Sequence, residues 1–527
     1  MIVLIYSSLI IFATIIAIGF YIFVIYPTMR FLVMKYKYGH KVKVFFSIGT
    51  GILKFYNQSL IQNKDSIAFI RNMHQKGLQA IAFNLGTKVG LSFLDPELQK
   101  QVHQSYQSFR RIDAIAAMTY LLGNSMIYAA DKEWKRQRLF LGKFFHFDEI
   151  KNYYPTIQET TKQVLQGVNE QLNQKEQIEI KAVYIIQKIT SEATFKMFFG
   201  LTTESLMITR KDGTQIAFSD ELALLIRHSF QLLQTDKIAL LKWILLKRKS
   251  TDYFSTKGEQ DLMDRLKNLR QGFIKIVSKR KEELSQDPSK AKNNFLDYYL
   301  TEMVQNQYSG ITYDEIVDNF TGIFLAGTDT TSNMVGSALY YLSINPEIQQ
   351  KAREEVVQVV SSKQDFKKHD QLASQLRFED ITHFNFLNCI LKESLRLIPP
   401  VIQITSRIAN HNMKIGEFDI KQGDLVTTNF AYNLSNPDIF PNPELFNPQR
   451  WMTANNYSET FSFTPFSQGP RNCIGQHLAM IEGKSILASI LLQFEILPNP
   501  NTEVIMDMKM MYGFQNDNLI YFKKLKQ

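Results

Sequence analysis

The most informative ten residues of this sequence are Phe466-Ser467-Gln468-Gly469-Pro470-Arg471-Asn472-Cys473-Ile474-Gly475. The glycines permit a tight loop whose backbone N–H groups can point at the Cys473 sulfur. A helix expected from about Gly475 would place its positive end beside a thiolate. A lone cysteine is most often a buried structural thiol. The fixed spacing of Phe466, Arg471 and two glycines around this one favours a sulfur that is held for chemistry.

The loop fits the pattern F-x-x-G-x-R-x-C-x-G and resembles the haem-ligand loop of the cytochrome P-450 family. The resemblance implies a haem b cofactor whose iron takes the Cys473 thiolate as its axial ligand, which favours cleavage of the O–O bond. It further implies that Phe466 packs beside the ligand, that Arg471 binds a haem propionate and that Gly475 belongs to the cofactor site. The second cysteine, Cys389, lies in a helical pattern and is expected in the core.

A second motif, Ala326-Gly327-Thr328-Asp329-Thr330-Thr331-Ser332, interrupts an apolar helix expected to begin near Tyr313. It is similar to the family's A/G-G-x-D/E-T-T/S pattern, in which small residues such as Ala326 let haem and O2 approach the backbone. A threonine hydroxyl can also bond back to a carbonyl and bend the helix. We expect Asp329 and Thr330 to relay protons to bound O2, through water. The alternative is a simple helix kink.

A helical E-x-x-R pair, Glu393 and Arg396, is by itself usually a solvated salt bridge. Followed by Arg450, it resembles the family's Glu-Arg-Arg triad, which implies a structural role in holding the cysteine loop. Two positions depart from the family pattern: Gln449 replaces an acid and Trp451 replaces a phenylalanine. Neither change removes the third cation.

Three further residues are expected at the cofactor because of the resemblance. Trp134 and Arg138 form a W-x-x-x-R pair that reaches a haem propionate in the family, and Arg407 stands where another propionate arginine is expected. The alternative for each arginine is an ordinary surface position. The resemblance extends from about Asn84 to the C-terminus. Leu434-Ser435 stand where the family often has His-Arg, and only Pro27 is near the expected proline-rich hinge.

Composition limits the remaining classes of function. The chain has 527 residues, a formal net charge of +10 and two cysteines, so a disulfide framework is not expected. A basic surface can meet nucleic acid, anionic lipid or an acidic protein. No basic tract is interleaved with stacking aromatic residues, so we expect no nucleic-acid partner.

The segment from Ile2 to Tyr26 is uncharged and long enough to cross a membrane. Basic residues follow it, which predicts a cytosolic body by the positive-inside rule. A cleaved signal peptide is the alternative, but bulky residues occupy the place of a cleavage site. We therefore expect residues 1–30 to be a transmembrane anchor with its flank, residues 31–527 to be the haem-thiolate catalytic domain, and the protein to be a single-pass protein of the endoplasmic reticulum membrane.

The expected architecture is mainly α with a minor β sheet, the fold of the family. Strands are predicted around residues 42–46 and on both sides of Gly86, and a helix is predicted to start at Asp95-Pro96-Glu97. Helical patterns cover most of residues 159–285 and 313–397, and a last helix runs from about Gly475 to Leu492. A partial Gly-x-Gly at residues 49–51 is interpreted as a turn, because a lone partial match is weak.

By the resemblance, the substrate pocket is lined by residues 112–122, 318–325 and 401–404, which are mostly apolar and predict a lipophilic substrate. The basic amphipathic stretch 237–249 is either a membrane-dipping segment or an ordinary connection. No flavin or nicotinamide motif is present, so electrons must come from another protein. The resemblance implies an NADPH-dependent flavoprotein reductase, with cytochrome b5 as a further candidate donor. The expected docking cations are Lys132, Lys135, Arg136 and Lys143.

Three functions are considered. The first is a monooxygenase that inserts one atom of O2 into a lipophilic substrate. The second is a P-450-type isomerase or dehydratase that acts on a peroxide without O2, and the third is a non-catalytic haem sensor. The Asp329-Thr330 pair favours the first, because a rearranging enzyme or a sensor needs no proton relay.

Overall fold

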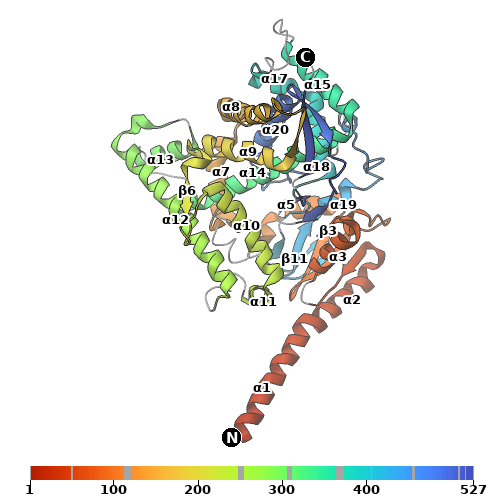
Figure 1. Ribbon diagram of the computed structural model, residues 1–527. Helices are drawn as coiled ribbons and strands as arrows, with labels where there is room; N and C mark the ends of the chain where they lie inside the picture. The colour runs from red at the N-terminus through yellow and green to blue at the C-terminus, as the bar shows by residue number, and fades with distance from the viewer. Residues whose placement is uncertain are drawn as a thin grey trace.

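The computed structural model describes residues 2–48, 51–111, 122–246, 254–292, 294–305, 311–361, 373–404, 406–453, 457, 459–508, 511–516 and 518–525. Helices dominate the described chain, and five small sheets accompany them. The expectation of a mainly α architecture with a minor β component is confirmed. Figure 1 shows helices stacked in the larger part of the body, with β3 and β11 near α3 on one side and β6 beside α12 on the other.

A long central helix, α14 (Tyr313–Ile344), organises the body and is buried along most of its length. Its start is fixed by a capping box, in which the Thr312 N–H donates to Glu315 Oε2 (2.7 Å). Helix α9 packs along it across the middle of the molecule (Figure 1). Helix α9 is Ala182–Phe199, and the other long helices around this pair are α8 (Phe147–Leu172), α18 (Asn385–Leu397) and α20 (Gln476–Leu491).

The remaining helices surround this centre. They are α3 (Leu53–Asn63), α4 (Ala68–Arg71), α5 (Pro96–Gln104), α7 (Asp131–Gly142), α10 (Phe218–Thr235), α11 (Lys237–Leu246), α12 (Lys257–Gln286), α13 (Phe295–Gln305), α15 (Pro346–Ser361), α17 (Phe378–His383) and α19 (Phe430–Leu434). Short 3-10 turns join several of them: η2 (Gly39–Lys41), η3 (Tyr106–Ser108), η4 (Lys143–Phe145), η5 (Thr203–Ser205), η7 (Pro288–Lys290) and η8 (Pro448–Trp451). The Asp95 carboxylate caps α5, as the sequence predicts, by accepting from the N–H groups of Glu97 and Leu98 (both 3.0 Å).

The main sheet has the strand order β1-β2-β3-β11-β8-β4. Its strands are β1 (Val42–Phe45), β2 (Ala80–Leu85), β3 (Lys88–Phe93), β4 (Phe109–Arg111), β8 (Arg407–Ala409) and β11 (Leu425–Thr428). Strands β2 and β3 form the hairpin expected around Gly86, whose φ is 59°. At the β4 edge, the antiparallel register places Arg111 opposite Arg407. This pairing brings two positive charges together.

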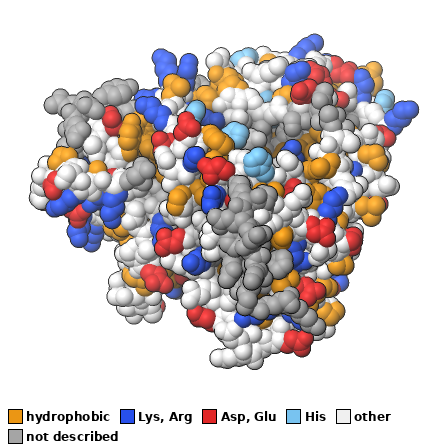
Figure 2. All heavy atoms as spheres, turned by 90° about the horizontal axis from the view of Figure 1, so that it is seen from above, with side chains coloured by type: hydrophobic (Ala, Val, Ile, Leu, Met, Phe, Trp, Pro, Cys, Tyr) orange, Lys and Arg blue, Asp and Glu red, His pale blue; other side chains and the backbone are white. Residues whose placement is uncertain are grey.

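The other sheets are smaller. They comprise β5 (Gln177–Lys181) with β12 (Phe494–Pro498) and β15 (Leu519–Lys524), β6 (Met207–Thr209) with β7 (Gln215–Ala217), β9 (Met413–Ile415) with β10 (Phe418–Ile420), and β13 (Met506–Met508) with β14 (Tyr512–Phe514). The face of the body seen in Figure 2 carries basic, acidic and hydrophobic side chains intermixed. Such a surface is typical of a protein face that meets water.

The N-terminal segment leaves the body as one projecting helix (Figure 1). It consists of α1 (Ile2–Phe20), a π-helical turn η1 (Tyr21–Ile25) and α2 (Tyr26–Tyr38), which follow one another directly. Among the described residues, this is the one helix long and apolar enough to cross a membrane. The Arg30 guanidinium of α2 forms a buried ion pair with Asp424, with Nη2 2.7 Å from Oδ2. The helix therefore runs past residue 30 and is fixed to the main sheet.

Candidate active site

The Cys473 side chain is open to a cavity of about 380 Å³ between α14, α20 and the cysteine loop. Most of the lining is apolar, as expected for a pocket that takes a lipophilic molecule. The cavity walls include all but one of the residues expected at the cofactor or the reaction centre: Trp134, Arg138, Ala326, Thr330, Arg407, Phe466, Arg471, Cys473 and Gly475. Asp329 is the exception.

The cysteine loop is closed by a hydrogen bond from the Cys473 N–H to the Phe466 carbonyl (2.9 Å). Gly469 has a φ of 76°, which glycine adopts without strain. Burial raises the pKa of the Cys473 thiol, whereas the Gly475 N–H and the Arg138 guanidinium act to lower it. A metal cation at the sulfur would strongly favour the thiolate. The loop thus presents one sulfur, backed by an N–H group and a cation, to the cavity.

A buried histidine supports this loop from outside. His103 of α5 donates from Nδ1 to the Gln468 carbonyl (3.0 Å). Burial, with a contribution from the Arg407 charge, lowers the pKa of His103 to about 4. The ring is therefore neutral at pH 7. The sequence offers no motif that singles out this residue.

Three arginines share one end of the cavity, and one of them was not expected from the sequence. Arg111 lies opposite Arg407 in the sheet, and the Arg471 guanidinium lies 4.4 Å from the centre of the Trp134 ring. Burial and neighbouring arginine charges lower the pKa of Arg111 to about 9 and that of Arg407 to about 10. The Nη1 atom of Arg407 is buried without a hydrogen-bond partner among the described residues.

This arrangement calls for an anionic ligand. Like charges directly opposite in a sheet destabilise it, and an unpaired buried donor costs about 1–3 kcal/mol. The two propionates of a haem would neutralise the cluster, and Cys473 would meet the iron. The residues therefore fit the cofactor that the sequence implies.

Arg138 is partly engaged by the protein itself. Its Nη1 donates to the Asn472 carbonyl (2.9 Å) and its Nη2 to Asn472 Oδ1 (2.7 Å). Burial lowers the pKa of Arg138, and the Cys473 charge opposes this effect. Arg138 thus braces the residue next to the ligand and also lines the cavity.

Thr330 and Asp329 are neighbours in α14 but face different spaces. The Thr330 hydroxyl donates to the Ala326 carbonyl (2.6 Å), and its side chain lines the cysteine cavity. Asp329 lines a second cavity of about 1300 Å³, and its Oδ1 accepts from Gln187 Nε2 (2.9 Å). The acid and the alcohol therefore stand on two sides of one helix, and Gln187, unnoticed in the sequence, holds the acid.

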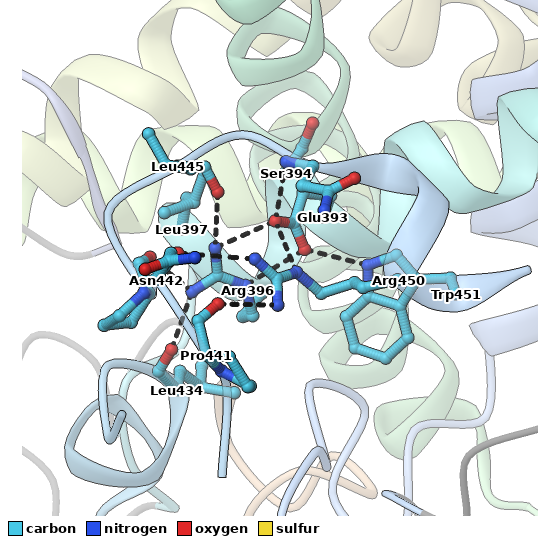
Figure 3. Close-up of polar contacts among 12 residues, drawn as sticks. Glu393, Ser394, Arg396, Leu397, Leu434, Pro441, Asn442, Leu445, Arg450 and Trp451 are labelled. Carbon is cyan, nitrogen blue, oxygen red and sulfur yellow. Dashed lines mark hydrogen bonds and ion pairs between the residues drawn. The ribbon is translucent and has the colours of Figure 1, made fainter. Parts of the chain in front are cut away.

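Glu393, Arg396 and Arg450 meet in one network, shown in Figure 3. Arg396 binds Glu393 through two bonds, Nη2 to Oε1 (2.9 Å) and Nε to Oε2 (3.0 Å), and Arg450 Nε reaches Glu393 Oε1 (3.0 Å). Arg396 also donates to the backbone carbonyls of Leu434, Pro443 and Leu445. Glu393 and Arg396 are almost fully buried.

Trp451 belongs to the same network. Its indole Nε1 donates to Glu393 Oε2 (2.8 Å), a bond that the phenylalanine expected at this position could not make. From the sequence alone, Trp451 is only a departure from the family pattern. The structure gives it a polar role, because it satisfies a buried carboxylate oxygen.

Only part of the segments expected to line the substrate pocket or to dock a redox partner can be placed in the structure. Residues 112–121 and 247–249 lie outside the described residues. Val401 and Ile404 line the cysteine cavity, but from 318–325 only Asn319, Gly322 and Ile323 do. Of the four expected docking cations, Arg136 is paired with Glu315.

Fold and site together define a haem-thiolate oxidoreductase. The family model described as Cytochrome P450 matches residues 48–522. Cytochrome P450 4V2 from Pongo abelii is 28% identical over 423 residues, which cover 75% of this chain and 73% of that protein. Cytochrome P450 4d8 from Drosophila melanogaster is 26% identical, covering 77% of this chain and 85% of the relative. Cytochrome P450 CYP72A219 from Panax ginseng is 25% identical, covering 79% and 76%.

The chain belongs to the cytochrome P450 family and is a haem monooxygenase. The expectations of family, fold class and enzyme class are confirmed. Membership also implies a haem iron with a cysteine thiolate ligand, O2 and a redox partner.

Proposed function

We propose that the protein inserts one oxygen atom from O2 into a lipophilic substrate, with haem b in the Cys473 cavity and electrons from a separate NADPH-dependent flavoprotein reductase. The observation that carries the proposal is the apolar cavity into which Cys473 and Thr330 both open. Fatty acids, sterols and xenobiotics all meet this description of the substrate.

When bound, the haem supplies O2 activation at its iron, which the Cys473 thiolate assists as an electron-donating ligand. Arg407, Arg471 and Arg138 hold the propionates in this proposal, and Arg111 joins them. Phe466 and Trp134 pack against the cofactor. The triad of Glu393, Arg396 and Arg450 fixes the chain segments that lead to the cysteine loop.

Proton supply is assigned to Asp329 and Thr330. The second cavity on the Asp329 side is lined by many polar side chains, so water can reach the carboxylate there. The Thr330 Oγ1 donates to the Ala326 carbonyl and can still accept a hydrogen bond, and its side chain lines the cysteine cavity. A proton could pass from solvent to Asp329 and then, through water, to Thr330.

Electron transfer is assigned to the exposed edge of α7 and η4. Lys132, Lys135 and Lys143 are exposed there and can attract an acidic flavoprotein or cytochrome b5. Arg136 is left out because its guanidinium is committed to Glu315.

We also infer that residues 1–30 anchor a catalytic domain, 31–527, to the cytosolic face of the endoplasmic reticulum membrane. The exposed apolar surface of α1 supports the anchor, since such a surface is unfavourable in water. Helix α11 carries exposed Ile238 and Leu241 on the side of the body from which α1 departs (Figure 1), which supports membrane contact there.

The decisive experiment is the absorption spectrum of the dithionite-reduced, CO-bound protein beside a Cys473→Ser control. We expect a Soret band shifted far to the red in the wild type and its loss in the control. An ordinary haem–CO band in well-folded wild-type protein would refute thiolate ligation by Cys473.

A second measurement separates the rival functions. A monooxygenase must consume O2 and NADPH in step with product when the reductase is present. Conversion of a lipid peroxide without O2 or reductase would identify the isomerase or dehydratase instead. Haem binding without any product from a broad lipophilic panel would favour a sensor.

A further inference from the structure

A groove of about 280 Å³ lies where the N-terminal helix joins the body, and it shares no lining residue with the cysteine cavity. One wall is the face of η1 and α2 that carries Ile25, Met29, Val33 and Lys37, which are spaced four residues apart. The opposite wall belongs to the strand β10 and the turn after it, which supply Asp419 and Lys421. The groove is thus apolar toward the membrane helix and charged at its other end.

The charges at the polar end leave an excess of positive charge. Arg30 is paired with Asp424, and Lys37 with Asp419. Lys421 is exposed, and within the described part of the chain its ammonium group has no carboxylate partner. Asp419 is the only acid in the groove lining, and it has a second cation, Lys414, 3.9 Å away. An anion at Lys421 would therefore meet net attraction.

The position of the groove along the N-terminal helix indicates what kind of anion it would bind. A membrane span needs roughly 20 residues for a hydrocarbon core of about 30 Å. The uncharged segment Ile2–Tyr26 is about five residues longer than this, so the groove, whose lining starts at Tyr21, begins where the hydrocarbon ends. Met29 and Val33 are more than half exposed just beyond this point, although water is a poor solvent for them. A molecule that is apolar at one end and anionic at the other would cover both features.

We propose that the groove binds one phospholipid with an anionic headgroup. Its acyl region lies on Ile25, Met29 and Val33, and its phosphate is held by Lys421, with Lys37 beside it. This proposal rests on the membrane anchoring proposed above. The bound lipid would join the anchor helix and the catalytic body through contacts with both.

The test uses the full-length holoprotein in nanodiscs of mixed phosphatidylcholine and phosphatidylserine, with the retained lipid identified by native mass spectrometry. We expect the wild type to retain phosphatidylserine preferentially, and Lys421→Ala to lower this preference about fivefold, as for loss of one charge at a membrane surface. Val33→Asp should lower retention of phosphatidylserine as well, since it places a negative charge on the acyl wall. The reduced CO spectrum of each variant checks folding.

The matched control is Lys43→Ala, which removes an exposed lysine of the same region that does not line the groove. An equal effect of Lys43→Ala and Lys421→Ala would mean general attraction to an anionic surface and would overturn the site. Normal insertion without any lipid preference would overturn it too, while leaving the anchor intact. A chain that fails to insert would overturn both proposals.

Discussion

At the scale of single residues, Thr330 gives the sharpest test of the proton relay. Thr330→Ala removes the hydroxyl that lines the cysteine cavity and keeps the helix. We expect a normal CO spectrum but at least about tenfold less product per NADPH, with electrons diverted to hydrogen peroxide. Stopped assays of NADPH, peroxide and product measure this coupling.

The matched control is Thr321→Ala, which removes a hydroxyl that also bonds back within α14, to the Val317 carbonyl (3.4 Å), but does not line the cavity. Coupling should be unchanged in this control. If NADPH consumption in Thr330→Ala stayed coupled to product as in the wild type, the proposed proton relay would be contradicted.

Arg111 tests whether the arginine cluster binds the haem propionates. Arg111→Leu removes one of two like charges that oppose each other between β4 and β8. We expect the haem-free protein to become more stable, because repulsion is relieved, and the holoprotein to lose haem about tenfold faster, because a propionate partner is gone. Thermal unfolding of both forms and haem transfer to apomyoglobin give the two readouts. Haem loss at the wild-type rate would remove Arg111 from the cofactor site.

His103 predicts a pH dependence. Its pKa falls from an ordinary 6.5 to about 4 in the folded protein, so the unfolded chain binds more protons between these values. Stability should therefore fall as pH drops from 6.5 to 4, by on the order of 3 kcal/mol in all. His103→Gln keeps an N–H donor for the Gln468 carbonyl and cannot titrate. Denaturant unfolding across this range should give a flatter curve for the variant, and parallel curves would contradict the assignment.

The sequence identifies those site residues that stand in short motifs. Cys473, Arg471 and Thr330 can be found because their neighbours fix the pattern. Arg111 and Gln187 could not be found, because each reaches the site by a tertiary contact, one through strand register and the other across two helices. Trp451 could be seen but not interpreted, since only the fold shows which oxygen its N–H meets.

At the scale of elements, the Glu393 network should control how the loops around α18 are held. Glu393→Gln leaves Arg396 buried, charged and short of its partner, which costs about 3–5 kcal/mol. We expect a lower unfolding temperature and weaker haem retention, measured by thermal scans of the CO-complex spectrum. Glu176→Gln, which removes an exposed partner of Lys523, should leave both unchanged. A Glu393→Gln protein that is as stable as the wild type and retains its haem fully would contradict the structural role of Glu393.

Elements were predictable where local chemistry sets them. The hairpin around Gly86 and the capped start of α5 follow from a turn residue and from Asp95-Pro96, and both are present. The pairing of β4 with β8 joins residues almost 300 positions apart. No local pattern encodes such a contact, because it depends on how the helices between them pack.

At the scale of the whole molecule, the junction between anchor and body can be tested by truncation. A protein lacking residues 2–20 keeps Arg30, whereas one lacking residues 2–30 leaves Asp424 buried without its guanidinium. We expect the longer truncation to be less stable by about 3 kcal/mol, measured by unfolding in detergent. Arg30→Leu in the full chain should reproduce the loss. Equal stability of the two truncations would show that the ion pair of Arg30 with Asp424 does not stabilise the folded protein.

The continuous helix from α1 to α2 has one more consequence. A membrane helix tilts when its apolar length exceeds the thickness of the bilayer. Since the ion pair of Arg30 with Asp424 fixes this helix to the main sheet, the body must tilt together with the helix. Bilayer thickness would then set the angle of the catalytic body to the lipid surface, and moving the protein between thin and thick membranes would re-aim the whole enzyme without changing a residue.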